Sequence, residues 1–224
     1  MKWGIEATMF NLDPTTIISR ILILIIALSV HEFSHAFVAD RFGDTTPRAH
    51  GRLTLNPAAH LDLMGSLMLI LVGFGWARPV PINPYVLNRR SPSALMWVSF
   101  AGPLSNLALA FMAAILLRVG GFTYSFSPTG MFPTPFQFLV AFIQINLLLF
   151  LFNLIPLAPL DGEKIAQYFF PPAWANFLDR IHPYGPMILM MIIFVGPMLG
   201  IDIFGWVLMP VLNTISRLLI GGLG

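Results

Sequence analysis

Long apolar runs separated by short polar segments make up most of the chain. Five of these runs predict transmembrane helices, over residues 15–38, 93–117, 136–154, 184–200 and 203–220. The first three hold about the 20 apolar residues that a helix needs to cross a bilayer. A further run over 64–76 has only about 13 residues, a length typical of a re-entrant or interfacial segment.

The segment after the first run is polar, and Gly43 and Pro47 end the first helix there. In GRLTLN, residues 51–56, polar residues alternate with Leu53 and Leu55, which is a weak strand signal. The pattern as a whole predicts an all-α polytopic membrane protein with four to six transmembrane helices. A small re-entrant or β-hairpin region follows the first span, and residues 1–224 form a single membrane-embedded domain.

Composition agrees with this class. Hydrophobic residues make up 57% of the chain and charged residues only 10%, whereas soluble domains carry about 25% charged residues. The net charge of +2 comes without a basic cluster, so nucleic acid is not an expected partner. The chain has no cysteine, so any metal ion must be held by histidine and carboxylate side chains.

Charge also orients the chain in the cell membrane. Lys2 is offset by Glu6 and Asp13, and the apolar run that follows is longer than a signal-peptide core, so we expect an uncleaved first span. Arginine and lysine concentrate in residues 40–92 and 158–183, which predicts that both regions are cytoplasmic and that the N-terminus is outside.

The sequence HEFSH, residues 31–35, lies in the cytoplasmic part of the first span. His31 and His35 are four residues apart and share a helix face, while Glu32 lies about 100° around the helix from His31. In the HExxH motif the two histidines bind zinc, and the glutamate is the general base for a water on the metal. The three residues could instead be hydrogen-bonded packing groups, but ionisable residues inside a membrane are costly and mark function.

Catalytic zinc usually has three protein ligands, so a third must come from elsewhere. The candidates are the remaining acidic residues with His50, His60 and His182. Asp161 stands out because it follows a span broken by two prolines, and irregular backbone at membrane depth lines a cavity or is buried in protein. On spacing alone, Asp161 could equally be the N-cap of a short helix.

The motifs HEFSH and NLIPLAPLDG resemble those of the site-2 protease family, the zinc intramembrane metalloproteases. That family carries HExxH in one span and NxxPxxPLDG in a later one. The stretch AGPLSN is similar to the GxxxN element of the family, through Gly102 and Asn106. The loops are too short for the PDZ or CBS domains of many members, so the resemblance is to a compact member.

This resemblance implies one zinc ion per chain, bound by His31, His35 and Asp161, with Glu32 as the catalytic base. Asn153 would position the substrate or stabilise the oxyanion, although it could equally satisfy backbone groups near Pro156. The implied reaction is endoproteolytic cleavage in or near a transmembrane segment of a membrane-anchored protein. The partners are then the bilayer and substrates with a helix-destabilised segment, and an edge strand at 51–56 could hold the unwound peptide by β-augmentation.

Two other functions fit part of the pattern. A divalent-metal transporter also places ionisable groups inside the membrane, and an inactive homologue could bind membrane segments without cutting them. A transporter has no need of Glu32 beside the first ligand, and its ligands would be spread along a path. The complete HExxH and LDG motifs argue against an inactive homologue.

Overall fold

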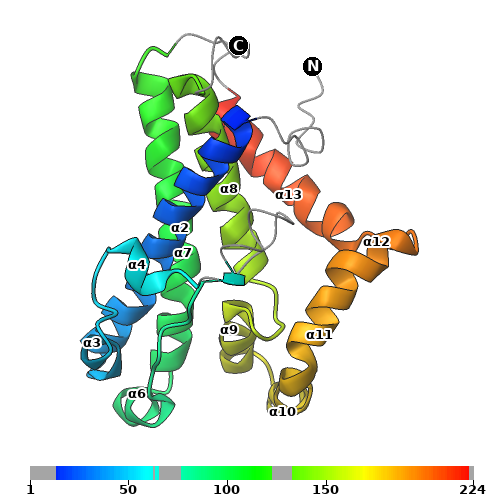
Figure 1. Cartoon of the computed structure of the whole chain (residues 1–224). Helices are drawn as coiled ribbons and strands as arrows, with labels where there is room; N and C mark the ends of the chain where they lie inside the picture. Colours follow the sequence, from blue (N-terminus) through cyan, green and yellow to red (C-terminus); the bar gives the residue numbers. More distant parts are fainter. Residues whose placement is uncertain (1–13, 63, 66–76, 123–132, 222–224) are drawn as a thin grey trace.

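The structure is a computed structural model that describes residues 14–62, 64–65, 77–122 and 133–221, and it is predominantly helical (Figure 1). The long helices are α2 (Pro14–Arg41), α7 (Ala94–Val119), α8 (Pro135–Asn153) and α13 (Ile203–Ile220). Together with the apolar helical segment Pro172–Met198, they give five helices long and apolar enough to span a membrane. The predicted all-α polytopic class is confirmed.

Helix α7 is the centre of the bundle and packs against α2, α8 and α9 (Asp161–Phe169). Small side chains on α7, among them Ala110 and Ala113, meet Ile143 and Leu147 of α8 and Leu212 of α13 in one buried cluster. Small residues let helix backbones approach closely, which is how helices associate in an apolar solvent. A second cluster joins the end of α2 to the start of α7.

Short helices fill the polar segment between α2 and α7. They are α3 (Thr46–Ala49), α4 (Pro57–His60) and α6 (Pro84–Arg90). Each begins at or next to a proline, whose fixed φ suits the first turn. The side chains of Asn56 and Asn83 cap α4 and α6 by accepting hydrogen bonds from backbone N–H groups.

Residues 51–56 form a loop, so the strand predicted for GRLTLN is wrong. Side-chain hydrogen bonds hold this loop: the His60 ring bonds to the Thr54 carbonyl, and Arg52 donates to the carbonyls of Ala59 and Arg78 outside the segment. Arg52 is buried and Leu55 is exposed. The described part of this region holds one isolated bridge, between Leu61 and Ala77. The predicted re-entrant segment 64–76 lies mostly outside the described residues.

The last third of the chain begins with α9 and α10 (Pro172–Ile181) and continues through η1 (His182–Tyr184) and α11 (Gly185–Met190). A π-helical stretch η2 (Met191–Val195) and α12 (Gly196–Met198) complete this segment before α13. Helix α13 starts beside the end of α8, where Phe204 stacks on Phe152, and ends beside the end of α7, where Arg118 donates to the Leu219 carbonyl. Helix α2 runs antiparallel to α7, so α2 begins and α13 ends at the same end of the molecule (Figure 1).

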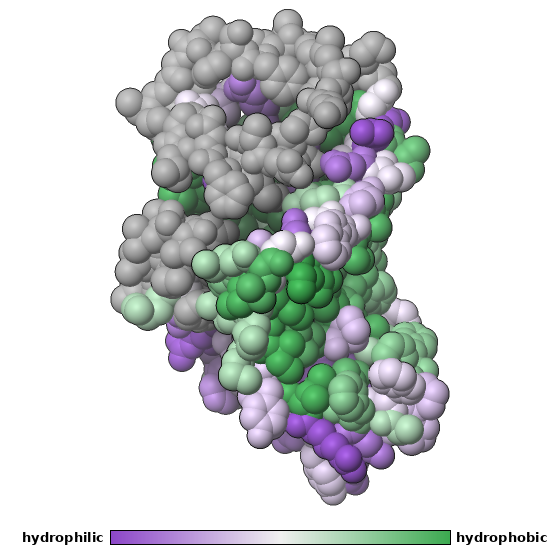
Figure 2. All heavy atoms as spheres, turned by 90° about the vertical axis from the view of Figure 1, so that its right-hand side faces the viewer, coloured by the Kyte–Doolittle hydropathy of each residue, from purple (hydrophilic) through white to green (hydrophobic). Residues whose placement is uncertain are grey.

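The side of the molecule that carries α11 to α13 has an apolar outer surface, as a lipid-facing surface must. Figure 2 shows a broad hydrophobic area on the side that carries α11 to α13, with hydrophilic residues gathered below it. Met187, Met191, Trp206 and Val207 are exposed on these helices. A soluble monomer rarely exposes so much contiguous apolar surface, so the protein is a membrane protein.

Candidate metal centre

Helix α2 presents His31 and His35 toward α7 and α9, and both rings are buried. Nε2 of His31 lies 3.1 Å from Oδ2 of Asp161, and Nε2 of His35 lies 3.3 Å from the same oxygen. The ligand atoms of the three residues all lie within 4.8 Å of one another. The structure thus brings together the two histidines and Asp161, which is 126 positions beyond His35 in the printed sequence.

Hydrogen bonds on the far side of each ring fix which nitrogen faces the centre. Nδ1 of His35 lies 2.7 Å from the Val98 carbonyl oxygen, which can only accept, so this nitrogen carries the proton. Nδ1 of His31 lies 2.7 Å from Oδ1 of Asn106. The Asn106 amide nitrogen donates to the carbonyls of Ala27 and Asn146, which leaves Oδ1 as the acceptor for His31. Both Nε2 atoms therefore present lone pairs, as metal ligands do.

Gly102 of α7 faces both imidazoles. A Cβ atom at this position would lie 2.4 Å from Nε2 of His35 and 2.5 Å from Nε2 of His31. No side chain fits at these distances, so glycine keeps open the space in front of the ligand nitrogens. The GxxxN element thus contributes twice, through the space at Gly102 and the acceptor at Asn106.

Helix α9 begins at Asp161, its N-cap position is Leu160, and the Asp161 side chain points to the two histidines. The N-cap interpretation of Asp161 is therefore wrong. The helix starts tightly against the preceding loop, because a Cβ on Gly162 would lie 2.3 Å from the Ile155 carbonyl oxygen.

These residues fit a zinc ion. Ligand atoms about 2.0–2.2 Å from a tetrahedral zinc lie about 3.4 Å from one another, close to the two histidine–aspartate separations. Two neutral imidazoles and one carboxylate form a set that zinc accepts, with the fourth position left for water or substrate. Among the described residues, no other group of three histidine or acidic side chains converges in this way.

Glu32 is buried beside the histidines on α2, and its charge acts on His35. No hydrogen bond from the described part of the chain reaches the Glu32 carboxylate, so it is free to accept a proton from a water in the centre.

The other candidate residues lie outside the cluster. The amide of Asn153 donates to the Leu149 carbonyl one turn back in α8, so its predicted part in catalysis stays a prediction. His60 is fully buried and bonds within its loop, Asp62 accepts from the Gly65 N–H, and His50 is exposed. None of these three joins His31, His35 and Asp161.

Sequence reasoning missed one group that supports the centre, Asn146, and one buried ion pair on α9, that of Glu163. Asn146 of α8 is fully buried and accepts from the Asn106 amide while donating to the Phe142 carbonyl. Glu163, buried on α9, accepts a hydrogen bond from His182 at 2.6 Å and pairs with Lys164. An asparagine in an apolar span was the available signal for Asn146, while Glu163 was considered only as a metal ligand.

Comparisons with known proteins agree with this centre. The chain is 43% identical to "Putative zinc metalloprotease YwhC" of Bacillus subtilis, over 87% of this chain and 85% of that protein. It is 33% identical to "Putative zinc metalloprotease Rip2" of Mycolicibacterium smegmatis, over 77% of this chain and 67% of that protein. The chain belongs to the site-2 protease family.

The chain is also 28% identical to "Putative zinc metalloprotease MJ0611" of Methanocaldococcus jannaschii, over 65% of this chain and 66% of that protein. No model of a known protein family matches the chain, and no solved structure matches it. The relatives' names and the histidine–aspartate cluster identify a zinc metalloprotease of the membrane, and they do not favour the transporter or the inactive binder.

Proposed function

We propose that the protein is a zinc-dependent intramembrane endopeptidase that hydrolyses peptide bonds in or near transmembrane segments of membrane-anchored proteins. The observation that carries the proposal is the position of the centre on a spanning helix. His31 precedes Arg41 at the end of α2 by ten residues, about 15 Å along a helix. A bilayer core is about 30 Å thick, so a centre at this depth acts on peptide inside or at the border of the membrane.

His31, His35 and Asp161 would hold one zinc ion per chain. Bound there, zinc lowers the pKa of a water to about 7 and polarises the peptide carbonyl. Glu32 accepts the proton of the attacking water and later gives a proton to the leaving amine. Asn106 and the Val98 carbonyl keep the imidazoles in the tautomer that binds metal, and Asn153 would position the substrate or stabilise the oxyanion.

The substrate must unwind before it can be cut, because a helical peptide bond is already hydrogen-bonded and shielded. We expect substrates whose transmembrane segment is locally destabilised as a helix. Residues 51–56 carry no strand, so the edge-strand capture considered from the sequence loses its basis. The arginine-rich end that carries α3, α6 and α10 would face the cytoplasm, by the charge asymmetry of the sequence.

The decisive experiment compares cleavage of a single-span substrate in detergent by the wild type and by Glu32→Ala, with zinc quantified in both. Loss of a general base costs about 10²–10⁴-fold in rate, while the three ligands remain. We expect the variant to keep about one zinc and to lose cleavage by that factor. Equal cleavage by the two proteins, or zinc crossing liposomes without any cleavage of a broad substrate panel, would overturn the proposal.

A further inference from the structure

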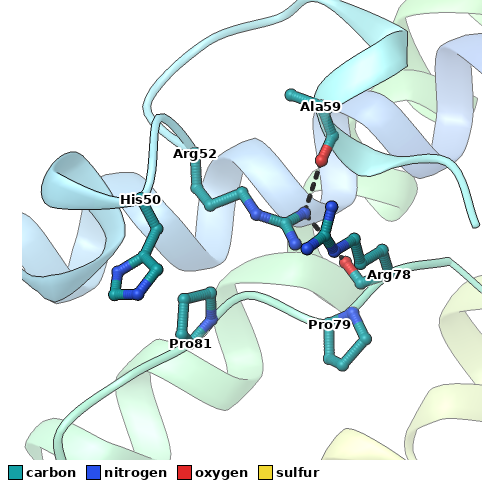
Figure 3. A pocket seen from close by; sticks show the side chains of 6 residues that line it. All are labelled: His50, Arg52, Ala59, Arg78, Pro79 and Pro81. Carbon is teal, nitrogen blue, oxygen red and sulfur yellow. Dashed lines mark hydrogen bonds between the residues drawn. The ribbon is translucent and has the colours of Figure 1, made fainter.

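A cavity of about 440 Å³ opens in the loops beside the centre. Arg52, Arg78 and His50 line it together with Ala59, Pro79 and Pro81 (Figure 3). Its size is that of a pocket for a small ligand or a side chain. The polar groups that line it carry donors and positive charge, so its chemistry suits an anion.

Arg52 is held in place but is not neutralised. Only 5% of the Arg52 surface is exposed. Its Nη1 atom donates to the carbonyls of Ala59 and Arg78. A guanidinium carries five N–H donors, and those on Nε and Nη2 have no partner among the described residues. Burial and then the charge of Arg78 lower the pKa of Arg52, whereas the charge of Glu32 opposes this.

The acidic residues of this region are engaged elsewhere. Asp40 pairs with Arg48, while the buried Asp44 accepts from the backbone N–H groups of Thr46 and Asn83. No carboxylate of the described residues lies within ion-pair distance of Arg52 or Arg78. Two neighbouring guanidinium groups repel each other, and a carboxylate that accepts hydrogen bonds from both would relieve this repulsion.

The cavity lies where an unwound substrate would pass. Helix α4, whose Ala59 lines the cavity, packs against α2, which carries the histidines and Glu32. Pro79 and Pro81 form one wall of the cavity and have no backbone N–H group. Hydrogen-bond donors for an anion must therefore come from the two arginines.

We propose that Arg52 and Arg78 form a subsite that accepts an acidic side chain of the substrate, near the scissile bond. The inference rests on the proposed function and adds a substrate preference to it. A peptide carboxylate is favoured over a lipid phosphate because α4, which lines the cavity through Ala59, packs against the helix that carries Glu32. Arg78 is the residue to change, since its side chain is exposed and makes no hydrogen bond with the described residues.

The experiment uses single-span peptides that differ only in one glutamate or glutamine, moved along the residues that flank the cleavage site. Binding is measured by fluorescence anisotropy with full-length Glu32→Ala protein, and kcat/KM is measured with the active enzyme. We expect the glutamate peptide to be preferred about tenfold at one or two positions, from a charge-assisted hydrogen bond. Arg78→Gln should bring the ratio near one in both assays. Arg90→Gln is the matched control, an exposed arginine outside the cavity, and should keep the ratio.

A ratio near one at every position in the wild type, or a ratio that survives Arg78→Gln, overturns the subsite. Nanodiscs of phosphatidylcholine with and without phosphatidylglycerol test whether the anion that the cavity binds is a lipid phosphate instead. If Arg78→Gln changes only the response to phosphatidylglycerol, the cavity binds a lipid phosphate and the substrate subsite is wrong. If the wild type binds the glutamate peptide preferentially but cleaves neither, the proposed function fails while the acidic-peptide subsite stands.

Discussion

Gly102 is the position in the metal centre where a single methyl group has the largest effect. Its added Cβ would meet both ligand nitrogens, so we expect Gly102→Ala to lower the zinc content well below one per chain and to abolish cleavage. Alanine favours a helix over glycine by about 1 kcal/mol, so α7 itself should stay folded. Ala101→Gly is the control, because it weakens the same helix by about that amount without touching the ligands. A Gly102→Ala protein that holds a full zinc ion would contradict the geometry.

Asn146 acts on the zinc through two other residues. It orients the Asn106 amide, which in turn accepts from His31. We expect Asn146→Leu to weaken zinc binding about tenfold, the lower end of the effect of outer hydrogen bonds on metal sites. Competition with a chelating dye measures this affinity directly.

Asn153→Leu is the matched comparison, since Asn153 lies two turns further along the same helix and, among the described residues, its amide bonds to the Leu149 carbonyl alone. We expect it to leave zinc affinity unchanged. If Asn153 positions the substrate as predicted, the kcat/KM of the Asn153→Leu enzyme falls. An unchanged kcat/KM would mean that Asn153 has no part in catalysis and serves only its local hydrogen bond.

At the scale of helices, the start of α9 determines where the third ligand lies. Gly162 sits against the backbone of Leu154 and Ile155, so a larger residue must push α9 away from that loop. Overpacking of this kind costs about 1–3 kcal/mol. We expect Gly162→Val to lower both the melting temperature in detergent and the zinc affinity, because Asp161 moves with the helix. A loss of stability with full zinc affinity would mean that α9 shifts without moving its first residue.

For the whole molecule, zinc should act as a crosslink between distant parts of the chain. Its ligands lie on α2 and α9, so binding to the folded state alone stabilises the fold by about 2.7 kcal/mol at a free zinc concentration of 100 times Kd. We expect a chelator to lower the melting temperature and to stop cleavage, with both restored by zinc. His35→Ala should show no zinc-dependent rise in melting temperature; a rise of the wild-type size would place the stabilising ion elsewhere.

The course of the helices also predicts the topology. Helix α2 starts and α13 ends at the same end of the molecule (Figure 1), which requires an even number of crossings. The segment α10–α12 is then apolar and membrane-embedded but not a complete crossing. The chain has no cysteine, so single cysteines report sidedness cleanly. In intact cells we expect an impermeant maleimide to label Val119→Cys and a cysteine placed after α13, but not Asn88→Cys on α6. Opposite labelling of the ends of α7 and α13 would contradict the arrangement.

The sequence by itself determined the class of the fold and most of the centre. Apolar runs of spanning length are a local property, and two histidines four residues apart share a face of any helix, so neither depends on the rest of the chain. The tertiary structure decided everything that joins separate segments: that Asp161 faces the histidines and caps nothing, that Gly102 leaves room for them, and that Asn146 supports Asn106 across 40 residues. It also decided against a strand at 51–56, where the His60 ring bonds to the Thr54 carbonyl and the Arg52 side chain is held by the carbonyls of Ala59 and Arg78. Alternation describes only neighbours, whereas these hydrogen bonds depend on residues brought close by the fold.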